Sequence, residues 1–151
     1  MLHKIDGTDL WHVPLRHPRL WCGPAAACIL TGQDYDKVIR PALNRVTGRA
    51  SNAGVRGMLA YNLVAALKGM GWTCQFTMPN ADRAPTLRRF AEWAAEETDW
   101  PVLVHVTGHF VVCQREIVVD NRETNTAAEH WCRRRYVRHA WRVCETVEQY
   151  L

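Results

Sequence analysis

The spacing of apolar residues changes halfway along the chain, and this change limits the fold more than any other feature. Residues 57–70 carry apolar side chains at helical spacing and stop at Gly71, whereas the apolar runs at 101–106, 109–113 and 116–120 are short and rich in valine. Helical spacing predicts an amphipathic helix, and short apolar runs separated by turn-length gaps are typical of neighbouring strands. Helices followed by strands predict an α+β domain with a mostly antiparallel sheet.

The same patterns predict the other elements. Pro24 lies where the first turn of a helix accepts proline, and the alanine-rich run after it continues to a stop at Gly32. This helix is apolar on all sides, which predicts a central, buried position. The remaining predicted elements are a helix at 35–46 that Pro41 limits or bends, a strand at 72–78, a helix at 86–96, and a last strand or pair of strands within 132–145.

The chain is long enough to bury a real core. Its 151 residues are 48% hydrophobic and 23% charged, as in an ordinary globular protein, so we expect a single domain over residues 1–151. No apolar run approaches the roughly 20 residues that span a bilayer, and the N-terminus lacks the pattern of a secretory signal. The net charge of +4 is too small to argue for nucleic acid. We therefore expect a cytoplasmic protein with neither membrane nor nucleic acid as partner.

Six cysteines are scattered through the chain, and none forms a C-x-x-C pair. Without a secretion signal we expect reduced thiols rather than a disulfide framework, and most of them are interpreted as small buried side chains. Cys22 is the exception, because it lies at the start of the alanine-rich helix, directly before Gly23 and Pro24. At a helix start the macrodipole and the free backbone N–H groups favour a thiolate and supply donors for an oxyanion.

A nucleophilic cysteine needs a base, and the two strands after residue 108 offer one. If residues 114–115 form the tip of a tight hairpin, His109 lies directly opposite Asp120, with Cβ atoms about 5 Å apart. The carboxylate then fixes the imidazole tautomer and leaves the other ring nitrogen as the base. A longer loop would shift the pairing, and Asn121 is then the next polar candidate for the orienting role. The sequence thus predicts a catalytic set of Cys22, His109 and Asp120.

These residues resemble the motifs of papain-like cysteine peptidases, most closely the branch that contains the bacteriocin-processing, double-glycine leader peptidases. The resemblance implies a papain-like fold in which a nucleophile helix in the N-terminal half packs on the antiparallel sheet of the C-terminal half. It also implies a thiol protease, that is, a hydrolase of peptide or amide bonds that needs no cofactor, and a bacterial or bacteriophage origin. The matching segments, which lie within about residues 15 to 145, are CGPAA at 22–26, LVAALKGMG at 63–71, GHFVV at 108–112 and VVDN at 118–121.

The chain departs from these peptidases in one respect. They carry a glutamine shortly before the cysteine, whose side chain helps to form the oxyanion hole, whereas every glutamine here follows Cys22. His17 and Arg16 are the alternative donors, and loss of one oxyanion donor typically lowers the rate by about 10²–10³. The departure leaves an alternative open: a weak or inactive papain-like fold that serves as a binding or structural subunit of a larger assembly, for instance in a virion. The expected partner is a peptide or protein substrate in the first case and other assembly proteins in the second.

Three residues next to the predicted catalytic set are candidates for a substrate cleft. Trp21 is placed to form a wall beside the nucleophile. Gly23 is small enough to let a substrate backbone approach, and Gly108 lies directly before the predicted base.

Two other groups of residues suggest different chemistry. His105, His109 and Cys113 recur at four-residue steps, but the period of this segment is that of a strand, so we expect no metal site. Arginines and aromatic residues alternate over 131–142 and would suit phosphates or bases. A solvated basic strand, or a sheet edge protected by charge, is the favoured interpretation of that segment.

Overall fold

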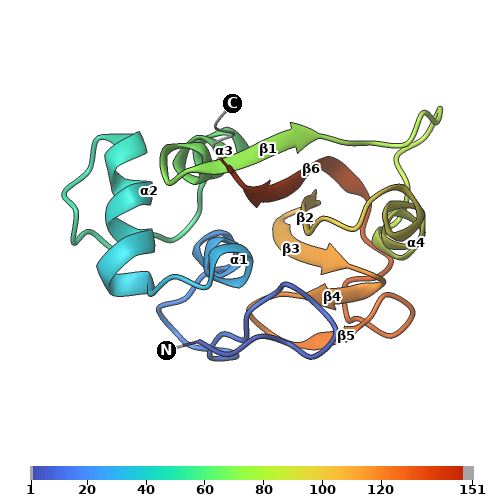
Figure 1. Cartoon of the computed structure of the whole chain (residues 1–151), viewed down its shortest axis with the longest axis horizontal. Coiled ribbons are helices and arrows are strands. Elements are labelled where there is room, and N and C mark those ends of the chain that lie inside the picture. Colours follow the sequence, from blue (N-terminus) through green and yellow to red (C-terminus); the bar gives the residue numbers. More distant parts are fainter. Residues whose placement is uncertain (1, 148–151) are drawn as a thin grey trace.

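Helices fill the first half of the chain and strands most of the second, as the change of period predicts (Figure 1). The computed structural model describes residues 2–147, and over this range no helix is long and apolar enough to cross a membrane. In chain order the elements are α1 (Cys22–Thr31), the π-helical turn η1 (Tyr35–Ile39), α2 (Arg40–Thr47), α3 (Ala60–Gly69), β1 (Trp72–Phe76), α4 (Leu87–Glu97), β2 (Val102–Val106), β3 (His109–Gln114), β4 (Ile117–Val119), β5 (Thr124–Thr126) and β6 (Val137–Glu145).

The strands of the described part form one six-stranded sheet in the order β1-β6-β2-β3-β4-β5. Each pair of neighbours in it is antiparallel, which confirms the predicted α+β class. Of the segment 132–145, predicted as a last strand or pair of strands, residues 137–145 form a single strand, β6, and residues 132–134 before it form turns. β6 lies inside the sheet between β1 and β2, so it is not an edge strand. β5 was not predicted, because its sequence is three polar residues with no apolar alternation.

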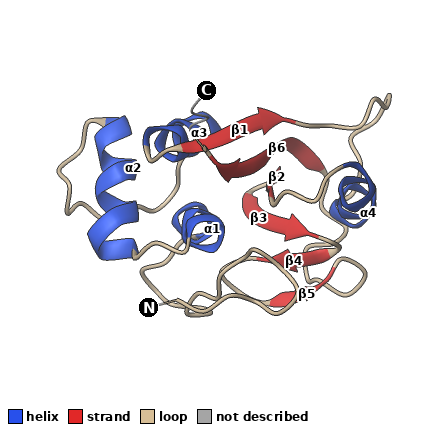
Figure 2. Ribbon diagram, viewed as in Figure 1, coloured by secondary structure: helices blue, strands red, loops and turns tan. Residues whose placement is uncertain are grey.

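The helices lie on both faces of this sheet (Figure 2). α1 and α3 lie on one face, with α2 packed against α3 farther from the strands, and α4 covers the other, so each face has its own apolar core. Successive residues of the central strands alternate between the two cores, and this explains why their sequences are continuously apolar. Leu103, Phe110 and Val112 pack towards α1, whereas Val104, Val111 and Cys113 pack towards α4.

The alanine-rich helix α1 is central, as its all-round apolar sequence predicts (Figure 1). Its residues from Gly23 to Thr31 are all buried. Small side chains allow the helix to pack closely between α3 and the sheet. The helix ends at Gly32, whose φ of 71° is left-handed and whose N–H group donates to the carbonyl of Cys28.

The predicted helix at 35–46 is two elements. The side chain of Asp34 caps the π-helical turn η1 by accepting a hydrogen bond from the backbone N–H of Lys37. Pro41 lies in the first turn of α2, directly after the π-helical turn, so it marks the limit between the two elements.

The β3–β4 hairpin has a different register from the predicted one. Its tip is Arg115 and Glu116, both at positive φ (50° and 65°), and Gln114 pairs with Ile117. The prediction placed the tip one residue earlier, which moves every cross-strand partner by two positions. Because strand side chains alternate with a period of two, this shift leaves each residue on the same face of the sheet. His109 and Asp120 therefore remain on one face as diagonal neighbours rather than direct partners.

Candidate active site

Cys22 is the first residue of α1, so its side chain lies at the positive end of the helix dipole. The preceding residue, Trp21, has an extended backbone and provides no side-chain cap for Cys22–Thr31, and the first turn of this helix carries no acidic residue. The N-terminal N–H groups are thus left without a competing carboxylate or hydroxyl. A negative charge on the Cys22 sulfur, or beside it, is favoured at this place.

The imidazole of His109, at the start of β3, lies between Cys22 and Asp120. Its Nε2 is 2.7 Å from Oδ2 of Asp120, in a pair that is almost fully buried. The carboxylate holds a proton on Nε2, so Nδ1 is the nitrogen that remains for the thiol of Cys22. The structure thus brings the three predicted catalytic residues together: Asp120 is hydrogen-bonded to the imidazole, and the imidazole lies close enough to Cys22 to shift the pKa of its thiol.

The pKa of Cys22 is lowered from its ordinary value. Burial by itself would raise it, but the hydrogen bond and charge of His109 and the backbone N–H groups of Phe110 and Gly23 outweigh that effect. The pKa of His109 is raised: burial opposes this, and the hydrogen bonds to Asp120 and Cys22 overcome it. Both shifts favour a thiolate beside an imidazolium, the charge state that a cysteine nucleophile needs.

Asp120 accepts hydrogen bonds from other donors as well as from His109. Its Oδ2 also accepts a hydrogen bond from Trp131 Nε1 at 2.7 Å, and its Oδ1 accepts from the backbone N–H groups of Arg122 and Glu123, each at 2.9 Å. Burial alone would raise the pKa of this carboxyl, yet the hydrogen bonds from histidine and from the backbone hold it well below its usual range. Asp120 is therefore a fixed negative charge behind the imidazole.

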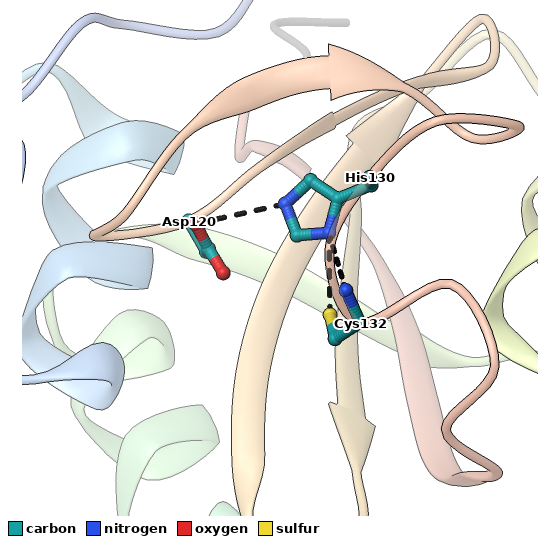
Figure 3. A group of neighbouring side chains, drawn as sticks. All are labelled: Asp120, His130 and Cys132. Atoms are coloured by element: carbon teal, nitrogen blue, oxygen red, sulfur yellow. Dashed lines mark hydrogen bonds and ion pairs between the residues drawn. The ribbon is translucent and has the colours of Figure 1, made fainter.

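A second histidine lies behind Asp120 (Figure 3). His130 Nδ1 is 3.3 Å from both the backbone nitrogen and the Sγ of Cys132, while its Nε2 is 3.6 Å from Asp120 Oδ1. Burial, followed by the charge of Asp120, raises the pKa of the Cys132 thiol to about 12, so this sulfur keeps its proton. Because Nδ1 accepts from Cys132, the ring carries its proton on Nε2, directed at the carboxylate.

Asp120, His130 and Cys132 are also the residues here that could hold a metal ion, since their donor atoms lie within 4.8 Å of one another. The imidazole, however, stands between the other two and presents a different nitrogen to each (Figure 3). His130 Nδ1, the nitrogen nearer Cys132, is already engaged by the backbone N–H and the thiol of that residue. We interpret the group as a buried support behind Asp120, in which Cys132 holds the imidazole and Nε2 of His130 faces the carboxylate at 3.6 Å without forming a hydrogen bond.

Trp131 covers the pair formed by His109 and Asp120. The edge of its ring meets the imidazole at a centroid distance of 5.1 Å, and its N–H donates to the carboxylate. The guanidinium groups of Arg122 and Arg135 lie over the indole, 4.1 and 4.7 Å from its centroid. This cover excludes water from the buried hydrogen bond and strengthens it. Sequence reasoning missed the role of Trp131, because the segment around it has no periodicity that fixes its position.

His17 and Asn121, the residues predicted to donate to the oxyanion or to orient the imidazole, form other contacts. His17 Nδ1 accepts from the backbone N–H of Arg19, and its ring lines a separate cavity together with Cys28. Asn121 donates from Nδ2 to the carbonyl of Leu20 at 3.2 Å, so it ties the chain before the nucleophile to the chain after Asp120. The described contacts of His17 are with Arg19 and the lining of that cavity, and it is Asp120, not Asn121, that is hydrogen-bonded to the imidazole.

The three candidates for a substrate cleft have different environments. Trp21 is 46% exposed and lines a cavity. Gly23 is buried, and a Cβ atom on it would come within 3.0 Å of Met58, so packing and not substrate access accounts for this glycine. Gly108, at φ 72°, forms the turn before His109, and no other described atom lies within 4 Å of the space its Cβ would fill.

The histidine series that begins at His105 and the arginine-rich segment at 131–142 form contacts within the protein. His105 stacks on Phe110 with ring centroids 4.7 Å apart, on a different strand from His109. Four of the arginines in the C-terminal basic segment donate hydrogen bonds to protein oxygens, which favours a structural role for them: Arg133, Arg135, Arg138 and Arg142.

The site therefore joins a thiol at a helix start, an imidazole with one free nitrogen, and a buried carboxylate. No protein-family model and no curated protein matches this chain. The geometry of the site is what indicates its chemistry. Such a set suits nucleophilic attack on a carbonyl carbon followed by proton transfer to a leaving group.

Proposed function

We propose that this protein is a papain-like cysteine hydrolase that cleaves a peptide or amide bond. The observation that carries the proposal is the position of Cys22 at the start of α1, next to an imidazole that buried Asp120 holds at 2.7 Å through Nε2. The helix packed on an antiparallel sheet and the chain order of Cys22, His109 and Asp120 support the papain-like assignment. All six cysteines are free thiols, and thiolate chemistry of this kind requires reducing conditions, so a cytoplasmic location is part of the proposal.

In the first half of the reaction the Cys22 thiolate attacks the carbonyl carbon of the scissile amide. The electron pair of the C=O bond moves to the oxygen and forms a tetrahedral oxyanion. His109 then donates its Nδ1 proton to the leaving nitrogen, the C–N bond breaks, and the amine departs. A thioester on Cys22 remains, and the imidazole is neutral.

In the second half, neutral His109 accepts a proton at Nδ1 from a water molecule, whose oxygen attacks the thioester carbon. Collapse of the second tetrahedral oxyanion breaks the C–S bond and releases the carboxylic acid. The products are an amine and a carboxylate, and the thiolate–imidazolium pair is restored. Asp120 keeps its charge throughout and holds the imidazole in place.

The oxyanion has few hydrogen-bond donors in this site. Trp21 does not cap α1, so the backbone N–H of Cys22 is free to donate to it, but no glutamine precedes the nucleophile. One donor fewer lowers the rate by about 10²–10³, so we expect a slow enzyme. The same deficit favours the second candidate, a binding or structural subunit of a larger assembly such as a phage particle, in which the site no longer turns over.

Acyl transfer from p-nitrophenyl acetate tests the proposal, because this small activated ester needs no specific subsite. We expect a burst of p-nitrophenol equal to the number of protein chains, an acetyl group on Cys22 by peptide mapping, and slower steady release. Cys22→Ala should abolish the burst, whereas Cys144→Ala, which removes a thiol whose pKa is raised, should keep it.

The two candidates give different results in this assay. An acetylated Cys22 that never hydrolyses identifies the binding subunit. A burst that persists in Cys22→Ala contradicts the proposed hydrolase.

A further inference from the structure

A cavity of about 320 Å³ lies close to the start of α1. One wall is the segment from Pro18 to Trp21, the residue directly before Cys22. The opposite wall is formed by residues 54–56. Arg19, Arg40 and Arg56 all contribute to the lining, and none of the described residues that line the cavity is acidic.

The wall formed by residues 54–56 is fixed next to the start of α1 through its own packing. Met58 follows it and fills the space in front of Gly23, close enough that a Cβ on the glycine would come within 3.0 Å of Met58 Cγ. Val55, the residue before Arg56, is buried in the same core as α1. Arg56 is thus held near the catalytic cysteine by residues on either side of it.

The arginines of this cavity are not neutralised by carboxylates inside it. Arg40 pairs with Asp36 through Nη2 at 3.2 Å, but its Nε is buried without a hydrogen-bond partner. Neither Arg19 nor Arg56 forms an ion pair within residues 2–147. Guanidinium groups are planar donors that match a carboxylate in geometry as well as charge. The half-exposed indole of Trp21 offers an apolar surface for the methylene groups of a side chain.

We propose that this cavity binds the carboxylate of an aspartate or glutamate side chain in the peptide that Cys22 attacks. The proposal rests on the proposed hydrolase function and adds a substrate class to it: a peptide with an acidic residue near the scissile bond. Arg19 and Arg56 are the specificity-determining residues, and Arg40 supplies an inner donor through its buried Nε. The attraction is a charge-assisted interaction at a partly exposed site, so it weakens as salt concentration rises.

Peptidyl vinyl sulfones test this subsite without a known substrate. The probe set carries a glutamate or its neutral isostere glutamine at each of three positions on either side of the reactive carbon, and the second-order rate of Cys22 labelling is measured for each. We expect glutamate to be preferred over glutamine at one position by about tenfold. The double variant Arg19→Gln with Arg56→Gln should remove the preference, because the rate with the glutamate probe falls to that with the glutamine probe.

Arg83→Gln is the matched control, because it removes an exposed arginine in the segment between β1 and α4, which lines a different cavity. This variant should keep the tenfold preference, which separates a local subsite from a change in net charge. Melting temperatures of the variants verify that all remain folded. Equal labelling by glutamate and glutamine probes at every position overturns the acidic subsite but leaves the hydrolase intact. If no probe of either kind labels Cys22, the hydrolase proposal itself fails.

Discussion

Asp120→Asn is expected to lower the rate of acyl transfer by roughly 10³-fold and the free energy of unfolding by about 3 kcal/mol. Oδ2 accepts hydrogen bonds from both His109 and Trp131, and Oδ1 accepts from two backbone N–H groups. An amide NH₂ group placed at either position therefore opposes two donors. Toward His109 it also favours the wrong tautomer, with the proton on Nδ1 and no base for the thiol.

The loss of stability in Asp120→Asn has a defined pH dependence. The native-state pKa of Asp120 lies well below its usual range, so its contribution to stability is complete above the unfolded value of about 3.9 and is lost as pH falls below it. Urea denaturation should show the full difference between wild type and variant at neutral pH and a smaller one in acid. Asp82→Asn, at an exposed position, is the matched control and should change neither stability nor rate. A fully active, equally stable Asp120→Asn protein would contradict the assigned role.

Gly32→Ala is expected to destabilise the fold by about 3 kcal/mol, because two costs add at this residue. The φ of 71° is left-handed, and a Cβ atom would lie 2.5 Å from the indole of Trp11. Gly48 offers a matched comparison at the end of α2: its φ is 70°, and no described atom lies within 4 Å of a Cβ there.

Gly48→Ala should therefore cost only the conformational term of about 1–2 kcal/mol. Denaturant unfolding of both variants measures the two losses of stability. Their difference reports the packing of Trp11 against the end of α1. Equal losses of stability would mean that Trp11 moves aside freely and does not fix α1.

The sequence predicts that His109 and Asp120 lie close together, and this prediction does not depend on the exact position of the hairpin tip. The predicted hairpin tip is one residue away from the real tip at Arg115 and Glu116. Side-chain alternation depends only on whether a shift is odd or even, and this shift changes each partner by two positions. The two residues therefore stay on one face, where a diagonal pair is still within reach.

The parts of the site that the sequence does not predict come from segments without periodicity. His130 and Trp131 follow the short polar strand β5, and nothing in their spacing places them behind Asp120. Gly23 was interpreted through its small size alone, and only the packing of Met58 against it shows what that size is for. The arginine-lined cavity likewise joins two loops that lie far apart in the sequence.

The cysteines make the central claim testable in one experiment. All six lie within the described part of the chain, and Cys22 is the one whose pKa is lowered. Burial raises the pKa values of the other five: to about 12 for Cys28, Cys113 and Cys132, to about 11 for Cys74, and above the ordinary value for Cys144.

The decisive measurement is the rate of iodoacetamide alkylation of Cys22 against pH, by peptide mapping, in wild type, His109→Ala and the control His12→Ala, which changes an exposed histidine. We predict that Cys22 reacts at a pH below the value of about 8.5 for a free thiol, while the other cysteines do not. His109→Ala should move this titration above 8.5, because burial then acts without the imidazolium, and His12→Ala should leave it in place. If Cys22 titrates like a free thiol, or identically in wild type and His109→Ala, the thiolate–imidazolium pair does not exist and the proposed hydrolase is contradicted.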